Sequence, residues 1–224
     1  MKKAVIVLSG GLDSTTCMGI AKEKGYDLYP ITFHYGQRHN REVEQAEKVA
    51  HFYDAPEHRI VDVQFLQHIG GSALTDESME VRTDGVEEEV PSTYVPARNM
   101  IFLALASAYA EVIGAEAIYI GVSAVDYSGY PDCRPEFISS MGKTVNLATK
   151  AGTSGDNLVI QAPLMHLTKK ETIEEGVRLA VPYELTTSCY LGEEKACGEC
   201  DSCRLRLKGF EEADKEDPIL YAKR

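Results

Sequence analysis

The segment AVIVLSGGLDSTT, residues 4–16, is the part of the sequence that most constrains the fold. Its continuous apolar run, residues 4–8, is typical of a strand that is buried on both faces. Gly10-Gly11 interrupt this run, and residues 14–24 then favour a helix that ends at Gly25. A buried strand that leads through a short glycine turn into a helix predicts an α/β protein.

The alternation of strand and helix continues along the chain. The predicted strands are 28–35, 59–63, 117–122 and 158–160, and the predicted helices are 40–54, 97–113, 135–150 and one that begins at a Thr168–Glu171 capping box. This order predicts a doubly wound, mostly parallel sheet covered by helices on both faces. Residues 66–90 break the pattern and predict a long surface excursion, which is either functional or without a role.

Length and charge limit the organisation and the partners of the protein. The 224 residues (24.7 kDa) suit one large domain, 1–182, followed by a small C-terminal segment, 183–224. The formal net charge of −12 argues against nucleic-acid or membrane partners. The longest apolar stretch, 100–110, is too short to span a bilayer, and the apolar run 4–8 is too short for a secretory leader, so we expect a cytoplasmic protein.

The turn at residues 9–15 has the chemistry of a phosphate site. Its two glycines let the backbone approach an anion, the following helix presents unpaired N–H groups, and Ser9, Ser14 and Thr15 add hydroxyls. The dinucleotide fingerprint GxGxxG is excluded because Leu12 occupies the second glycine position. A Walker A loop at residues 137–144 is excluded because it would begin with Phe137. A tight turn without a ligand is the remaining alternative.

Four of the six cysteines cluster near the C-terminus. Cys189, Cys197, Cys200 and Cys203 lie within fifteen residues, the last three spaced C-x2-C-x2-C, which predicts a closed structural zinc site with four thiolate ligands. An iron–sulfur site and free surface thiols are the alternatives. A zinc ribbon for nucleic acid is disfavoured by the acidic neighbours Glu193, Glu194, Glu199 and Asp201.

Two segments in the middle of the chain carry further candidate site residues. Residues 95–99 (VPARN) place Arg98 and Asn99 at the start of the apolar helix, where Arg98 suits a phosphate or carboxylate, or else is a surface residue. Residues 126–137 (DYSGYPDCRPEF) combine aromatic rings, which can stack on a planar base, with carboxylates that can accept from a guanine-like N–H pair. A capped loop is the alternative. No histidine neighbours Cys133 in sequence, which disfavours a nucleophile there.

The motif SGGLDS after an N-terminal strand resembles the signature loop of the PP-loop family, the N-type ATP pyrophosphatases. With VLSGGLDSTT (7–16), FHYGQRH (33–39), VPARN, DYSGYPDCRPEF and the four cysteines in this order, the sequence resembles the 7-cyano-7-deazaguanine synthase branch of that family over nearly its whole length. The resemblance implies a ligase of queuosine biosynthesis that cleaves ATP to AMP and pyrophosphate. Its substrates would be 7-carboxy-7-deazaguanine and ammonia, its intermediates an adenylylated acid and an amide, and its cofactors Mg²⁺ with ATP and one structural zinc ion.

The resemblance also assigns residues to these roles. ATP would be held by Leu8, Ser9, Gly10, Gly11, Leu12, Asp13, Ser14, Thr15, Thr16, Cys17 and Met18. The catalytic groups would be Ser9, Asp13, Ser14 and Arg98. The deazaguanine acid would be held by Arg98, Asn99, Asp126, Tyr130, Asp132, Cys133, Arg134 and Phe137.

Three further expectations concern assembly and rival functions. We expect a homodimer, from the resemblance and from the apolar helix 97–113. A PP-loop enzyme that thiolates tRNA would need a basic RNA-binding surface, which the net charge disfavours. A non-catalytic, zinc-stabilised module that senses ATP stays open, and only an enzyme would release AMP.

Overall fold

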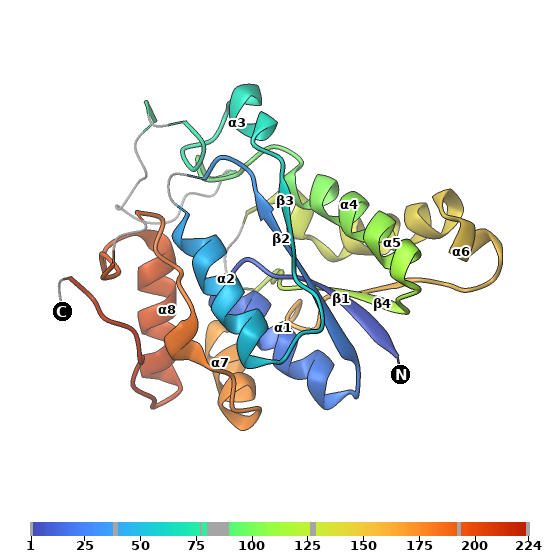
Figure 1. Ribbon diagram of the computed structural model, residues 1–224. Helices are drawn as coiled ribbons and strands as arrows, with labels where there is room; N and C mark the ends of the chain where they lie inside the picture. The colour runs from blue at the N-terminus through green and yellow to red at the C-terminus, as the bar shows by residue number, and fades with distance from the viewer. Residues whose placement is uncertain are drawn as a thin grey trace.

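A computed structural model describes residues 2–37, 40–76, 78–79, 90–125, 129–191 and 194–222 (Figure 1). The elements occur in the order β1 (Lys3–Val7), α1 (Leu12–Glu23), β2 (Asp27–His34), α2 (Arg41–Phe52), β3 (Arg59–Asp62), α3 (Phe65–Ile69), α4 (Arg98–Ile113), β4 (Ala117–Ile120), α5 (Pro135–Ala148), α6 (Lys150–Thr153), β5 (Val159–Gln161), α7 (Lys169–Arg178) and α8 (Asp201–Glu212), with short 3₁₀ turns at Pro131–Cys133 and Tyr183–Leu185. None of the helices in these described ranges is long and apolar enough to cross a membrane.

The five described strands form one parallel sheet with the order β3-β2-β1-β4-β5. The chain first runs outward from β1 to β3 and then returns to place β4 on the other side of β1. Crossovers between parallel strands are right-handed, so this reversal puts α4 and α5 on the opposite face from α1 and α2. The reversal leaves a crevice between the carboxyl ends of β1 and β4, where sheets of this type bind ligands. The predicted doubly wound α/β fold is confirmed.

Each face of the sheet has its own buried cluster. On one face, Val5, Ile31 and Ile118 pack with Phe102, Leu103 and Ala106 of α4 and with Ile138 and Val145 of α5. On the other face, Ile6, Leu28 and Tyr119 pack with Cys17 and Met18 of α1 and with Ala46 and Val49 of α2. Because the side chains of a strand alternate between faces, only an apolar run such as residues 4–8 can fill both clusters.

Three local predictions are corrected by the structure. The segment 66–90 is not wholly a surface excursion, because Leu66, Ala73 and Leu74 are buried against the α4 side of the sheet or beside it. The helix predicted at 97 begins at Arg98, since Ala97 adopts a left-handed conformation with φ of 57°. The helix predicted over 135–150 ends at Ala148, and Thr149 caps a separate short helix by accepting from the Gly152 N–H at 3.2 Å.

The C-terminal segment packs closely on the sheet domain (Figure 1). Phe210 of α8 and Ala213, which follows this helix, share a buried cluster with Leu12 of α1 and Ile173 of α7. The fully buried Arg206 donates to Asp217 through Nε at 2.8 Å and Nη2 at 2.9 Å, and to Thr186 at 2.7 Å. This buried ion pair attaches the tail of the chain to the loop that precedes the cysteines.

Candidate functional site

The glycine turn lies at the end of β1, at the point where the strand order reverses. The Ser9 and Ser14 hydroxyl oxygens are 3.0 Å apart, and Ser14 Oγ also donates to the Gly11 carbonyl at 3.1 Å. These bonds hold the turn in shape while Ser9 stays exposed. Among the described residues, no side chain caps α1 at Gly11, so the first N–H groups of this helix are available to an anion. The turn is therefore built to receive a phosphate.

Two glycines permit the close packing around this turn. Gly10 has φ of 77°, and a Cβ there would lie 2.3 Å from the Glu42 carbonyl oxygen and 2.7 Å from the Ala46 nitrogen, both at the start of α2. Gly121, directly after β4, approaches the turn from the other side, and a Cβ there would lie 2.8 Å from the Ser14 nitrogen. The sequence analysis did not single out Gly121, because its role appears only when β4 lies beside β1.

Asp13 forms an ion pair with a residue that sequence reasoning missed. Lys169, the first residue of α7, donates to the two carboxylate oxygens of Asp13 at 2.7 and 2.9 Å. A lysine in the first turn of a helix is electrostatically unfavourable there, and this was the available signal that Lys169 serves another purpose. The pair explains how a carboxylate can lie beside a phosphate site, because a cation lies next to it and balances its charge.

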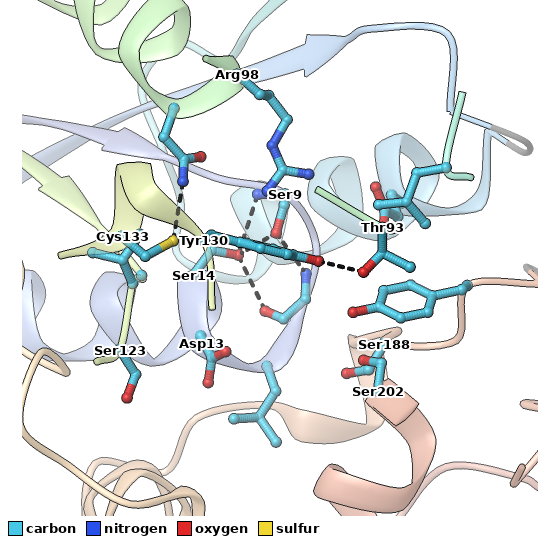
Figure 2. Close-up of a pocket in the computed structure, with 18 of the residues that line it drawn as sticks. Ser9, Asp13, Ser14, Thr93, Arg98, Ser123, Tyr130, Cys133, Ser188 and Ser202 are labelled. Atoms are coloured by element: carbon cyan, nitrogen blue, oxygen red, sulfur yellow. Dashed lines mark hydrogen bonds between the residues drawn. The ribbon is translucent and has the colours of Figure 1, made fainter. Parts of the chain in front are cut away.

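The turn opens into a cavity of about 300 Å³ (Figure 2). The walls come from the ends of β1, β2 and β4, the starts of α1, α2, α4 and α7, and the C-terminal segment. Of the residues assigned from the sequence, the cavity is lined by Ser9, Gly11, Leu12, Asp13, Ser14, Arg98, Asn99, Tyr130 and Cys133. Residues that the sequence analysis did not assign also line it, namely Tyr35, Glu42, Thr93, Ser123, Lys169, Thr187, Ser188, Tyr190, Asp201, Ser202 and Arg206.

Arg98 extends from the start of α4 into this cavity, and Figure 2 shows it directed toward Ser9 and Tyr130. Its guanidinium lies 5.4 Å from the ring centre of Tyr35 and 5.9 Å from that of Phe102, and Nη1 donates to the Tyr35 hydroxyl at 3.4 Å. Aromatic faces favour a guanidinium, so these rings fix its direction without neutralising its charge. Arg98 is therefore a cation of the cavity wall and not a surface residue.

Glu42 brings a carboxyl group to the same cavity from the start of α2. Burial raises the pKa of this carboxyl to about 7, and the positive charge of Arg98 opposes that rise. Burial also raises the pKa of the Tyr35 hydroxyl, and the nearby Glu42 charge adds to that rise. No pattern in the local sequence indicated Glu42, because it enters the site only through the packing of α2 against Gly10.

The loop 129–137 is partly inside the site. Tyr130 lines the cavity and its hydroxyl is 2.7 Å from Thr93 Oγ1, while Cys133 lines it and accepts from Asn99 Nδ2 at 3.3 Å. Asp132 is buried, and its carboxylate accepts from the Asn99 N–H at 2.8 Å, so it holds the start of α4 and is not a cavity residue. Arg134 is exposed, and Phe137 packs on the core beside α4 and α5; neither lines the cavity. Asp126 lies outside the described residues.

The far end of the assigned ATP segment lies in the protein interior. Cys17 and Met18 are fully buried between α1 and the sheet. Thr16 Oγ1 is bound to the Tyr183 hydroxyl at 2.8 Å, and Thr15 Oγ1 donates to the Gly11 carbonyl at 2.8 Å. These four side chains, with Leu8 and Gly10, are not among the residues that line the cavity. Their packing and hydrogen bonds stabilise the turn from the interior of the protein.

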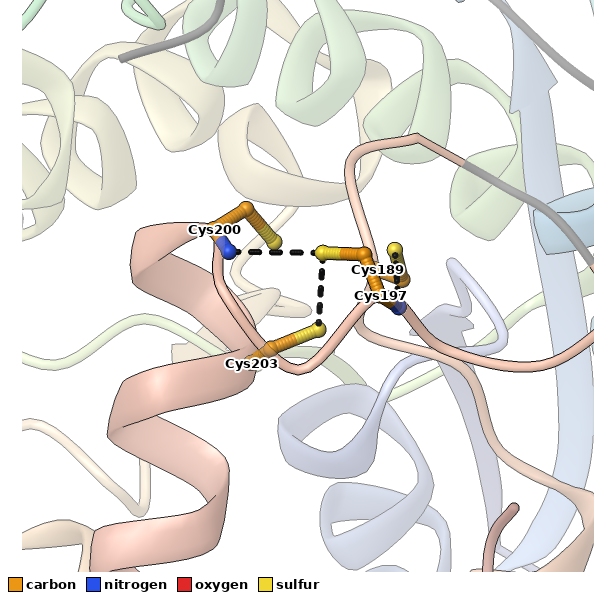
Figure 3. A group of neighbouring side chains, drawn as sticks. All are labelled: Cys189, Cys197, Cys200 and Cys203. Carbon is orange, nitrogen blue, oxygen red and sulfur yellow. Dashed lines mark hydrogen bonds between the residues drawn. The ribbon is translucent and has the colours of Figure 1, made fainter. Parts of the chain in front are cut away.

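The four clustered cysteines converge in space (Figure 3). The sulfur atoms of Cys189, Cys197, Cys200 and Cys203 all lie within 4.8 Å of one another, and those of Cys197 and Cys203 are 3.8 Å apart. Four thiolates at about 2.3 Å around a tetrahedral ion would be separated by about 3.8 Å. Hydrogen bonds from Cys200 and Cys203 hold the pKa of the Cys189 thiol well below its usual value. The group therefore fits a single tetrahedral metal ion.

The cysteine cluster is continuous with the wall of the cavity. Ser188 and Tyr190, on either side of Cys189, both line the cavity, and the Thr187 N–H donates to the Gly10 carbonyl at 3.0 Å. The start of α8, which carries Cys203, contributes Ser202 to the same wall. The metal-binding segment thus contacts the phosphate turn directly, a relation that the spacing of the cysteines does not reveal.

Comparison with known proteins agrees with this site. A model of the family described as "Queuosine biosynthesis protein QueC" matches residues 3–214. The chain is 64% identical over 220 residues to a 7-cyano-7-deazaguanine synthase of Oceanobacillus iheyensis, and the match covers 98% of each chain. It is 53% identical over 223 residues to the protein of the same name from Coxiella burnetii, with 99% of this chain and 98% of the other covered.

Solved structures share the fold at much lower identity. An NMN synthetase from Francisella tularensis matches 96% of this chain and 78% of its own, with a TM-score of 0.52 and 16% identity. A 4-thiouridine synthetase, solved with RNA and ATP, matches 95% of this chain and 50% of its own, with a TM-score of 0.52 and 20% identity. These likenesses support the α/β architecture described above.

Proposed function

Because the chain belongs to the QueC family of queuosine biosynthesis proteins, we propose that it converts 7-carboxy-7-deazaguanine and ammonia to 7-cyano-7-deazaguanine with cleavage of ATP. It is thus an enzyme, a ligase that forms carbon–nitrogen bonds. Within this reaction, the deazaguanine acid is first adenylylated, then aminated to an amide, then activated again and converted to the nitrile.

One observation of the structure supports this proposal most directly. The phosphate turn after β1 and the Tyr130–Cys133 segment open into the same cavity, although more than 100 residues separate them. An adenylyl transfer needs the α-phosphorus of ATP and the carboxylate oxygen in contact, and a shared cavity supplies that proximity. A protein that only senses ATP would have no need for a second ligand at the turn.

The cations of the cavity suit the first half of the reaction. We propose that the turn residues Ser9 and Ser14, with the open N–H groups of α1, bind the phosphates, and that Lys169 moves from Asp13 to a phosphate oxygen when ATP enters. Mg²⁺ bound with ATP would supply charge neutralisation, and the freed Asp13 carboxylate is the group beside the turn that suits it. Arg98 stabilises charge that develops on the reacting oxygens.

The part of the cavity wall that carries Tyr130 suits the planar substrate. We propose that the Tyr130 ring, which lines the cavity, covers one face of the deazaguanine. Asn99 and Asp132 then act at the start of α4, where the Asn99 N–H donates to the Asp132 carboxylate and holds the first turn of the helix that carries Arg98. We also propose Arg134 and Phe137 as substrate residues. Neither lines this cavity, so this role requires the loop to rearrange on binding.

The cysteine cluster is proposed to hold one zinc ion. All four sulfur atoms lie within 4.8 Å of one another, which suits four thiolates on one ion and is too close for thiolates bound to different irons of a cluster. With four thiolates the ion has no open position, so we assign it a structural role. The ion would stabilise the loop 186–190, which forms part of the cavity wall. We further propose a cytoplasmic homodimer that acts on small molecules and does not bind nucleic acid.

One assay tests the function. The purified protein is incubated with ATP, ammonia and 7-carboxy-7-deazaguanine, and the products are identified by mass spectrometry. We expect the nitrile, AMP and pyrophosphate, with about two ATP used per nitrile, because each oxygen removed must first become a leaving group. Formation of AMP with another acid but never with this one would contradict the substrate and leave only the PP-loop class. Absence of AMP with any acid would favour an ATP sensor.

A further inference from the structure

The cavity contains a carboxyl group, that of Glu42, to which none of the roles above is assigned. Phosphate binding uses the turn and Lys169, charge neutralisation uses Arg98, and Asp13 is held by Lys169 at 2.7 and 2.9 Å. Glu42 lies beside this machinery, at the start of α2, with its main chain packed directly over Gly10. It lines the cavity together with Arg98 and Tyr35.

The proposed reaction has an unmet chemical need at the nitrogen atom. In the amination, a C–N bond forms, the bond from carbon to the adenylyl oxygen breaks with its electron pair leaving on AMP, and the nitrogen must lose a proton. The amide oxygen is then adenylylated, which leaves two protons on a positively charged nitrogen. One proton leaves to give the neutral imidate, and the last leaves as the carbon–oxygen bond breaks with its electron pair on AMP and the nitrile forms. Each of the two steps therefore needs a base next to the reacting carbon.

Building on the proposed function, we propose that Glu42 is the general base that removes the nitrogen-bound proton in both steps. It is placed for this because the adenylate would form between the phosphate turn, on which α2 packs, and Arg98, which lines the same cavity as Glu42. The proton passes from nitrogen to the Glu42 carboxylate and then to solvent. The same carboxyl group serves twice because the carbon atom stays in one place throughout.

The electrostatic surroundings fit this role. Among the described residues, the charged and titratable groups that act on Glu42 are the Arg98 guanidinium from α4 and the Tyr35 hydroxyl after β2. Burial raises the pKa of the Glu42 carboxyl to about 7, against the influence of Arg98. A base with a pKa near the working pH combines a substantial ionised fraction with real affinity for a proton. Arg98 can attract the adenylyl phosphate and need not stay paired with the Glu42 carboxylate.

The test separates adenylylation from the nitrogen steps. Exchange of labelled pyrophosphate into ATP in the presence of the deazaguanine acid reports adenylylation, which needs no base of this kind. Amide and nitrile formation with ammonia reports the nitrogen steps. We expect Glu42→Gln to keep the exchange rate and the KM for the acid within about threefold of the wild type while the nitrogen steps slow by at least about 100-fold. Glu42→Asp, which retains a shorter base, should recover part of the rate.

Controls and contrary outcomes are defined by the same assays. Glu44→Gln, an exposed glutamate in the same helical turn, should leave both assays unchanged. Equal loss of exchange and of nitrogen chemistry in Glu42→Gln would overturn the proposal and make Glu42 a positioning partner of Arg98. A raised KM for the acid would show instead that it recognises the purine edge, and unchanged nitrogen steps would remove it from the reaction. Failure of the wild type to support exchange would contradict the proposed function itself.

The pH dependence provides an independent readout. At a fixed concentration of free NH3, the wild-type rate of amide formation should rise with pH through about 7, as Glu42 becomes ionised. This rise should disappear in Glu42→Gln, while the pH profile of the exchange reaction stays the same in both proteins. An unchanged rise in the variant would assign the titration to another group and not to Glu42.

Discussion

Single residues around the phosphate turn carry charges that a folded protein normally keeps in water. Asp13 and Lys169 neutralise each other at 2.7 Å, whereas Glu42 lies near Arg98 and forms no ion pair of that kind with any described residue. A buried charge without a partner costs stability, and such groups occur most often at sites of binding or catalysis. At the scale of the residue, this contrast leads to predictions for the turn residues Asp13 and Ser14 and for Glu42.

Replacement of Asp13 or Ser14 by alanine should abolish turnover without unfolding the protein. Ser14→Ala removes the hydroxyl bonded to Ser9 and Gly11, and Asp13→Ala leaves Lys169 without its carboxylate. We expect at least about a 100-fold loss in AMP formation, since both groups act on the phosphates. The melting temperature should change by only a few degrees, because the turn is not part of the core. Full activity of both variants would show that the turn is not the ATP site.

Glu42 should make stability depend on pH. Its pKa of about 7 in the folded protein lies above the ordinary value of 4.5, so the folded state binds the proton more tightly than the unfolded chain. The contribution to the free energy of unfolding is therefore complete below pH 4.5 and is lost as the pH rises through about 7, by up to roughly 3 kcal/mol.

Glu42→Gln cannot titrate, so the comparison isolates this effect. Its melting temperature relative to the wild type should be higher at pH 8 than at pH 5, measured by calorimetry at both pH values. A difference that does not change with pH would show that the Glu42 carboxyl is not stabilised in its neutral form in the fold.

At the scale of the element, the site depends on how closely two strand ends approach each other. Gly121, directly after β4, lies so near the turn after β1 that no side chain fits at this position. The metal-binding segment supports the opposite wall through the Thr187–Gly10 hydrogen bond. The geometry of the turn therefore depends on two neighbouring elements as well as on its own sequence.

Gly121→Ala should damage ATP binding. The added Cβ would lie 2.8 Å from both the carbonyl carbon of Asp13 and the nitrogen of Ser14, so the turn must shift. We expect a higher KM for ATP, a lower kcat and a loss of about 1–3 kcal/mol in stability. Gly142→Ala is the matched control, because nothing lies within 4 Å of its added Cβ in the exposed part of α5. It should keep full activity, and equal effects of the two variants would contradict the explanation.

Loss of the metal should affect both folding and the active site. Elemental analysis of the purified protein should give one zinc per chain, and Cys200→Ser should lose it with a clear drop in melting temperature. The KM for ATP should also rise, because the loop next to Cys189 bonds to Gly10. Cys17→Ala, which removes a thiol buried between α1 and the sheet, should retain the zinc. Iron with sulfide in place of zinc would overturn the assignment.

At the scale of the whole molecule, the surface of the α4–α5 side stands out. Val112 and Leu147 expose 84% and 81% of their surface, and Met100 of the same layer exposes 47%. These are the exposed apolar side chains that a dimer interface on this layer would cover, while the other face of α4 fills the core. Helix α4 thus serves the sheet on one side and is free for a partner on the other.

A second copy of the chain is the proposed partner. Light scattering at micromolar concentration should give twice the chain mass of 24.7 kDa. Replacement of Val112 by glutamate should shift the protein toward the monomer, because a charge would be buried in the interface. Replacement of the exposed Glu44 by lysine, on the other face of the sheet, should leave the assembly unchanged. A monomeric wild type would remove the proposal.

Short-range patterns along the sequence were enough to predict the α/β fold class. The apolar run at residues 4–8, the glycine pair and the capping box at Thr168 are short-range features, and each predicts its element from the same few residues. The four cysteines could likewise be grouped from spacing, since they lie close together in the chain. Arg98 and Tyr130 could be proposed as site residues because their motifs resemble those of the family.

Contacts between distant segments decided the rest of the site. Lys169 meets Asp13 across 156 residues, Glu42 enters the cavity because α2 packs over Gly10, and Asp132 turns toward Asn99 and away from the cavity. The reversal of strand order after β3 brings these segments together, and no window of sequence contains it. Local patterns report the free energy of forming one element, whereas the direction of a side chain at a site depends on which elements meet around it.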